Sequence, residues 1–151
     1  MMKMMSNNNA KRIMAIDFGD ARTGVAVSDE TRTLTGDAWV ISEKRPTALC
    51  RAIIAEADTR GVGLLVVGYP KNMNGTIGPR AVKSSELAES LRELSDIEVI
   101  LWDERLTTMQ AERILINTGN RRDKRKKTID AVAASLILDS YLKRSSTAID
   151  S

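Results

Sequence analysis

The sequence predicts an α/β fold in which helices flank a mixed sheet of five strands. Nearly continuous apolar runs mark buried strands, the apolar spacing changes to a helical period after the third strand, and helices and strands alternate from there on. The 151 residues fit one domain that buries its own core. We expect this domain over residues 11–145, with a disordered tail at 1–10 and a flexible tail at 146–151.

The first three strands predict an antiparallel meander. Residues 13–18 are almost all apolar and end at Gly19, as in a strand buried on both faces. Turn residues at 19–24 lead to a second strand at 25–28, and a third is expected at 35–41. Short connections between successive strands favour antiparallel pairing.

The rest of the chain predicts alternating helices and strands. Pro46 suits a first helical turn and Gly61 a C-terminal cap. Pro79 opens another helix, which carries an apolar stripe. The elements expected here are helices at 46–60, from 79, at 107–119 and at 128–143, strands at 63–68 and 97–102, a polar loop at 69–78 and a basic loop at 121–127.

The composition excludes several kinds of chemistry. The chain has no histidine and one cysteine, so zinc sites, Ser-His-Asp catalysis and an intrachain disulfide are excluded. Cys50 lies on an apolar helix stripe with no histidine to activate it, and we expect it in the core. No segment approaches the roughly 20 apolar residues of a membrane span, which predicts a cytoplasmic protein without a membrane partner.

A carboxylate interrupts the first strand. Alternation places Asp17 on the same face as Ile13 and Ala15, a face that should be buried. An uncompensated buried carboxylate costs on the order of several kcal/mol, so Asp17 needs a cation, a metal ion or hydrogen-bond donors. The alternative is an acid that accepts hydrogen bonds from turn amides near Gly19 or pairs with Arg22.

Two further acids stand at the ends of other elements. Glu104 directly follows the fifth strand, at a sheet edge where ligands collect in open α/β folds, with a solvated loop as the alternative. Asp130 is expected in the first turn of the last helix, where the helix macrodipole alone would explain an acid. Three carboxylates without histidine suit a hard cation, which predicts Mg²⁺, with Mn²⁺ as a substitute.

Four segments, taken together and in order, resemble the signature of the YqgF/RuvX family. They are Ile16-Asp-Phe-Gly-Asp-Ala-Arg-Thr-Gly-Val-Ala-Val-Ser-Asp29, Val67-Gly-Tyr-Pro-Lys-Asn-Met-Asn-Gly75, Asp103-Glu-Arg-Leu-Thr-Thr108 and Asp130-Ala-Val-Ala-Ala134. The resemblance covers residues 12–143 and implies a three-layer ribonuclease H-like fold similar to that of the RuvC Holliday junction resolvase. Members of the family are regarded as nucleases, with a proposed role in maturing the 5′ end of pre-16S ribosomal RNA.

The resemblance implies that Asp17, Glu104 and Asp130 are the catalytic acids and the metal ligands. The sequence departs from the wider RuvC group at one place. An acid usually ends the fourth strand in that group, whereas Gly68 and Tyr69 stand here and Glu104 comes after the fifth strand. The departure implies a different arrangement of the site or fewer bound ions.

Basic residues near the acids predict contacts with nucleic acid. The run at 121–127 holds six of the 23 basic residues and would attract a polyanion that the acids repel, with a solvated loop as the alternative. Arg22 and Arg105 either grip phosphate or neutralise a neighbouring acid. The loop at 71–75 should border the same crevice, with Met73 as a gap-filler. The predicted nucleic-acid-binding residues are Arg22, Lys71, Arg105, Arg121, Arg122, Lys124, Arg125 and Lys126.

These observations lead to the hypothesis of a Mg²⁺-dependent endonuclease that acts on structured RNA, with a ribosomal precursor as the expected substrate. Cleavage of branched DNA, as by a Holliday junction resolvase, is the alternative reaction. A non-catalytic nucleic-acid-binding module is the alternative of another class. A phosphotransferase of the actin-like group is disfavoured because such folds need two domains. A junction cutter is expected to be a homodimer, whereas an RNA trimmer can be a monomer.

Overall fold

The computed structural model describes residues 11–107 and 122–150, and side chains within 11–107 and 129–145. Beyond Thr107, the helix predicted at 107–119 lies outside these residues, as does the predicted tail at 1–10. The elements are β1 (Arg12–Phe18), β2 (Thr23–Ser28), β3 (Thr35–Ile41), α1 (Pro46–Arg60), β4 (Val62–Tyr69), α2 (Pro79–Leu94), β5 (Glu98–Asp103), the 3₁₀ helix η2 (Glu104–Leu106) and α4 (Arg122–Asp150).

The five strands form one mixed sheet in the order β3-β2-β1-β4-β5. β1 pairs antiparallel with β2, and β2 pairs antiparallel with β3. β4 runs parallel to β1 on one side and to β5 on the other. The prediction of an antiparallel meander extended by two parallel strands is confirmed, and the most continuous apolar runs form the central strands.

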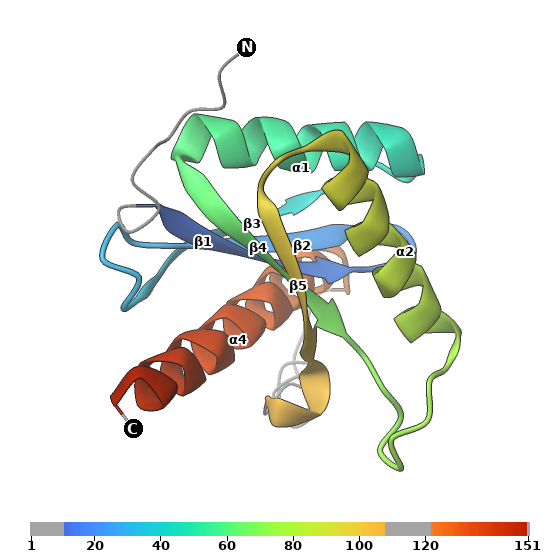
Figure 1. Cartoon of the computed structure of the whole chain (residues 1–151). Coiled ribbons are helices and arrows are strands. Elements are labelled where there is room, and N and C mark those ends of the chain that lie inside the picture. Colours follow the sequence, from blue (N-terminus) through green and yellow to red (C-terminus); the bar gives the residue numbers. More distant parts are fainter. Residues whose placement is uncertain (1–10, 108–121, 151) are drawn as a thin grey trace.

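Helices cover both faces of the sheet and give the fold three layers (Figure 1). α1 and α2 lie on one face, and α4 crosses the other. Because side chains alternate along β1, Met14 and Ile16 pack toward α1 and α2, while Ile13 and Ala15 pack toward α4. The same alternation places Asp17 on the face that α4 covers.

Cys50 is fully buried in α1, and burial raises the pKa of its thiol, as expected of a core residue. Within residues 11–107 and 122–150, no helix is both long enough and apolar enough to cross a membrane.

Helix α4 is longer at both ends than the sequence pattern predicts. Residues 122–127, predicted as a basic loop, are helical, and the helix continues through 146–150, where a tail was expected. The prediction was wrong because the apolar period begins only at Ile129, whereas lysine and arginine favour helices and no glycine or proline interrupts the segment. Asp130 therefore lies eight residues after Arg122 rather than in the first turn, where the macrodipole acts.

Leu65 provides a test of the core. This β4 side chain is fully buried against the layer formed by α1 and α2. Leu65→Ala is expected to lower the free energy of unfolding by about 2–5 kcal/mol, because it leaves a cavity among packed side chains. Leu94→Ala is the matched control at a side chain that is 47% exposed, and it should change this free energy by less than about 1 kcal/mol. Equal losses of the two variants in urea denaturation would contradict this core.

Candidate active site

Asp17 is buried at the carboxyl end of β1, with an exposed fraction of only 2%. It pairs in register with Gly24 of β2. On its other side the parallel register of Ile16 with Val67, continued by one residue, sets Asp17 beside Gly68 of β4. Residues in register project from the same face of a sheet. Asp17 therefore stands between two positions without side chains, and we call Gly24, Asp17 and Gly68 the glycine row.

Helix α4 lies directly on the glycine row at Gly24. A Cβ placed on Gly24 would be 1.9 Å from the backbone oxygen of Asp130 and 2.6 Å from its carbonyl carbon. No side chain fits into that space, so β2 and α4 approach each other through backbone atoms. This contact fixes the α4 backbone of Asp130 against the row.

Glu104 covers the other end of the glycine row. A Cβ placed on Gly68 would be 2.6 Å from Oε2 of Glu104 and 3.3 Å from its Cδ. The Glu104 carboxylate thus lies over β4 at Gly68, the strand position next to Asp17, although its own backbone follows β5. The structure therefore brings the three predicted acids, Asp17, Glu104 and Asp130, to one row of the sheet.

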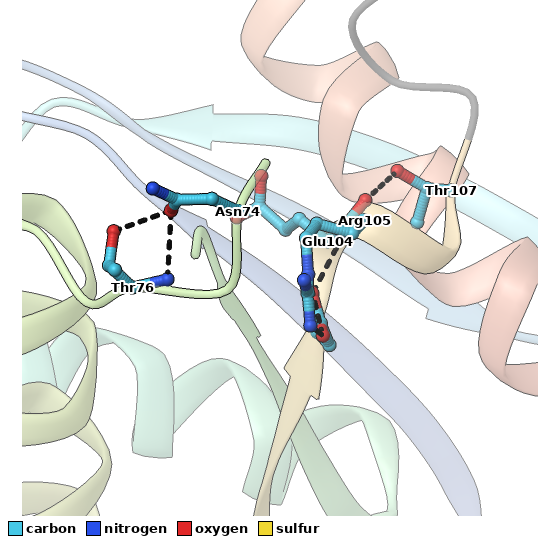
Figure 2. Close-up of polar contacts among 6 residues, drawn as sticks. Asn74, Thr76, Glu104, Arg105 and Thr107 are labelled. Atoms are coloured by element: carbon cyan, nitrogen blue, oxygen red, sulfur yellow. Dashed lines mark hydrogen bonds and ion pairs between the residues drawn. The ribbon is translucent and has the colours of Figure 1, made fainter. Parts of the chain in front are cut away.

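Hydrogen bonds hold the turn that carries Glu104 (Figure 2). Asp103 caps η2 by accepting a hydrogen bond from the backbone N–H of Arg105 at 2.9 Å. Thr107 donates its hydroxyl to the Glu104 carbonyl at 2.7 Å and its N–H to the same oxygen at 3.0 Å. The backbone of Glu104 is consequently fixed on both sides.

Ser140 connects this turn to α4. Its hydroxyl donates to the carbonyl of Leu106 at 3.2 Å and accepts from the indole N–H of Trp102 at 3.1 Å. Trp102 also packs edge-on against Tyr141, with the ring centroids 5.3 Å apart. Helix α4 thus carries Asp130 itself and also steadies the turn that carries Glu104.

The carboxylates of Asp17, Glu104 and Asp130 suit a hard cation, but they do not form a preformed metal site. Within the side chains that the structure describes, no three acidic groups are close enough together to enclose a metal ion as they stand. Oδ2 of Asp130 lies 3.9 Å from Nη1 of Arg22. Because the backbones of Asp17 and Asp130 are held at the glycine row and that of Glu104 is held by its turn after β5, side-chain rotation is the change that a shared ion would require.

A cleft opens beside Glu104 at the carboxyl ends of β4 and β5, with a volume of about 410 Å³. The expected position of the loop after β4, at the border of this crevice, is confirmed. Three cationic side chains share the cleft with the Glu104 carboxylate. The lining residues are Pro70, Lys71, Asn72, Met73, Gly78, Pro79, Arg80, Glu104, Arg105 and Thr107.

Internal hydrogen bonds close the loop between β4 and α2 (Figure 2). The N–H of Asn72 donates to the Thr76 carbonyl at 2.9 Å, and the Thr76 hydroxyl donates to Oδ1 of Asn74 at 2.7 Å. Gly75 permits this turn with a φ of 87°. Met73 is 72% exposed, so its predicted role as a gap-filler is wrong, because this polar turn leaves the side chain in solvent.

The two arginines next to the predicted acids have different partners. Arg105 donates from Nη2 to Asp103 at 2.8 Å and from Nε to both oxygens of that carboxylate. This hydrogen-bonded pair lowers the pKa of Asp103 and raises the pKa of Arg105. Arg22 lies near Asp130 instead. Each arginine thus has an acidic neighbour, but the neighbour of Arg105 is Asp103 rather than Glu104.

Arg80 is a cleft residue that the sequence analysis missed. It lies in the first turn of α2, and its guanidinium donates to the Phe18 carbonyl at 3.5 Å, which connects the cleft to the end of β1. The available signal was Pro79, which starts a helix at the same sheet edge. Of the predicted basic residues in the run, Arg121 lies outside the described residues, and only the helical backbone is described for Arg122, Lys124, Arg125 and Lys126.

Known relatives share most of this chain. A relative from Geobacillus thermodenitrificans, named "Putative pre-16S rRNA nuclease", is 49% identical over 87% of this chain and 96% of its own length. A protein of the same name from Halothermothrix orenii is 45% identical, over 87% of this chain and 94% of its own.

Solved structures share the ribonuclease H-like fold. Fowlpox virus resolvase, solved with Holliday junction DNA, has a TM-score of 0.55 at 16% identity and covers 88% of this chain and 97% of its own. Thermus thermophilus RuvC, solved with a Holliday junction substrate, has a TM-score of 0.50 at 12% identity and covers 89% of this chain and 96% of its own. A family model described as RuvX, Holliday junction resolvase, matches residues 11–144, which include every strand of the sheet. By this match and by its relatives, the chain belongs to the RuvX family.

Proposed function

We propose that this protein is a Mg²⁺-dependent endonuclease that hydrolyses phosphodiester bonds in maturation of the 5′ end of pre-16S ribosomal RNA. The observation that supports this proposal best is the placement of Asp17, Glu104 and Asp130 around one row of the sheet. The substrate class follows from the name of the relatives that align over most of the chain.

Asp17, Glu104 and Asp130 would hold the metal ion. Carboxylate oxygens are the protein ligands that Mg²⁺ prefers, and Mn²⁺ accepts the same ligands. When bound, the ion activates water and stabilises the leaving oxygen of the phosphodiester. The chain itself supplies one carboxylate fixed by burial, at Asp17, and one held by a hydrogen-bonded turn at the cleft, at Glu104.

Cations in the cleft would hold the phosphate backbone of the substrate. A group of carboxylates repels a polyanion, so neighbouring positive charge is needed for binding. Lys71 lies with its ammonium 5.8 Å from the ring centroid of Tyr69, and Asp103 orients the guanidinium of Arg105. Arg80 adds a third cation. Near Asp130, Arg22 would contribute further positive charge. The basic residues of 121–126, which precede Asp130 in the sequence, would add to it.

Branched DNA is the second candidate substrate, because the family model is described by Holliday junction resolution. A resolvase that cleaves two symmetric DNA strands would act as a homodimer. A nuclease that processes RNA would act as a monomer on ribosomal precursor particles in the cytoplasm. Digestion of a pre-16S RNA fragment and of a four-way DNA junction, beside a native-mass measurement, separates the two reactions. Binding to both nucleic acids without turnover would favour a non-catalytic module.

Asp17→Asn tests the role of the buried acid. The substitution keeps the size of the side chain and removes its charge, so kcat on a pre-16S RNA fragment with Mg²⁺ should fall on the order of 100-fold or more. Gel-based cleavage assays measure the effect, and circular dichroism checks the fold. Asp20→Asn, at a carboxylate that is 81% exposed, is the matched control and should retain wild-type activity. Equal activity of Asp17→Asn and wild type would remove Asp17 from the mechanism.

Lys71→Ala and Arg80→Ala test the cleft as a phosphate-binding surface. Each should weaken RNA binding and reduce the slope of log K against log salt by about one, because one phosphate contact is lost. Fluorescence anisotropy over a series of KCl concentrations measures this slope. Lys143→Ala, at an exposed α4 lysine paired with Asp139, is the control and should leave the slope unchanged. A wild-type slope in both cleft variants would argue against the cleft as a phosphate-binding surface.

A further inference from the structure

The Glu104 carboxylate lies over Gly68 of β4. A Cβ at this position would be 2.6 Å from Oε2 of Glu104 and 2.6 Å from Cδ1 of Ile137. Non-bonded heavy atoms pack at about 3.5–4.0 Å. A side chain at position 68 and the Glu104 carboxylate in its present place therefore exclude each other.

The order of the strands explains why this space matters. β4 separates β5 from β1, and strands lie about 4.8 Å apart, so the backbones of β1 and β5 are roughly 10 Å apart. A carboxylate anchored after β5 reaches Asp17 only by crossing β4 at its carboxyl end. Gly68 lies in extended strand backbone that any residue adopts, so the need for glycine here is spatial rather than conformational.

We propose that Gly68 is a positioning residue for Glu104: its lack of a side chain leaves the space through which the Glu104 carboxylate reaches Asp17. This inference rests on the proposed function, in which both carboxylates serve the cleavage reaction. Gly68 acts only through Glu104 and does not itself touch the reacting groups.

Gly24, in the same row, has a different role. The atoms that oppose it are the backbone oxygen and carbon of Asp130, which cannot rotate away, so a side chain there displaces α4 as a whole. The atoms that oppose Gly68 are the ends of two side chains, which can rotate. Gly24→Ala should therefore destabilise the fold, whereas Gly68→Ala should move a carboxylate and leave the fold in place.

Gly68→Ala tests the positioning role. We expect kcat on the pre-16S RNA fragment to fall on the order of 100-fold, as for a misplacement of about 1 Å at a reacting group, with KM and the urea midpoint close to wild type. A crystal structure of the variant should show the Glu104 carboxylate displaced from position 68. In a Glu104→Gln background, Gly68→Ala should cause no further loss of kcat, because the group through which it acts is already disabled.

Ile137→Val provides the matched control. It removes only Cδ1, the other side-chain atom that a residue at 68 would meet. The double variant Gly68→Ala/Ile137→Val should be as impaired as Gly68→Ala alone. Recovery of kcat in the double variant would mean that the steric clash with Ile137 of α4 had lowered kcat in Gly68→Ala, and would overturn the inference. Wild-type cleavage by Gly68→Ala, or an unmoved Glu104 carboxylate in its crystal structure, would also overturn it.

The proposed function and the positioning role fail in different ways. Wild-type cleavage by Glu104→Gln would refute the part of Glu104 in the reaction, while the crystal structure of Gly68→Ala still decides whether Gly68 sets its position. An inactive Glu104→Gln beside a fully active Gly68→Ala would refute the positioning role alone.

Discussion

The burial of the Asp17 carboxylate is the constraint on which the rest of this site depends. The sheet face around it consists of aliphatic side chains such as Ile13, Ala15 and Val66. A carboxylate in such surroundings costs on the order of several kcal/mol unless polar or charged groups approach it. Here the neighbouring strands present glycine on both sides, so the backbone of α4 and the side chain of Glu104 come within reach. The fold gives up aliphatic packing at two positions to make room for polar groups.

Helix α4 joins the stability of the protein to the geometry of its site. Ala133, Ile137 and Leu138 close the second half of the core, while Asp130 in the same helix lies on Gly24. The hydrogen bonds of Ser140 add the turn after β5 to this unit. A shift of α4 along the sheet would therefore change the core packing and the relation of two acids to Asp17 at the same time.

Much of the fold could be predicted from the sequence because its strands are continuous apolar runs. β1, β4 and β5 lie within one residue of the predicted ranges at each end, and alternation assigned Asp17 to the correct face. The start of α4 could not be predicted from apolar spacing, since the helix extends beyond its buried side. A residue that matters because it has no side chain is equally hard to recognise. In the sequence Gly68 is only a departure from the RuvC pattern, because the path of Glu104 over it depends on contacts between distant segments.

The position of α4 at the end of the fold affects how the protein is made. Ribosomes synthesise chains from the amino terminus, so the whole sheet emerges before the helix that covers one of its faces. Until that helix docks, Ala15, Val66 and their aliphatic neighbours are open to water, and Asp17 lacks the polar backbone that later lies over Gly24. A chain without α4 thus exposes aliphatic surface, which makes folding intermediates prone to aggregation, and the three acids come together only after α4 has been synthesised and has docked.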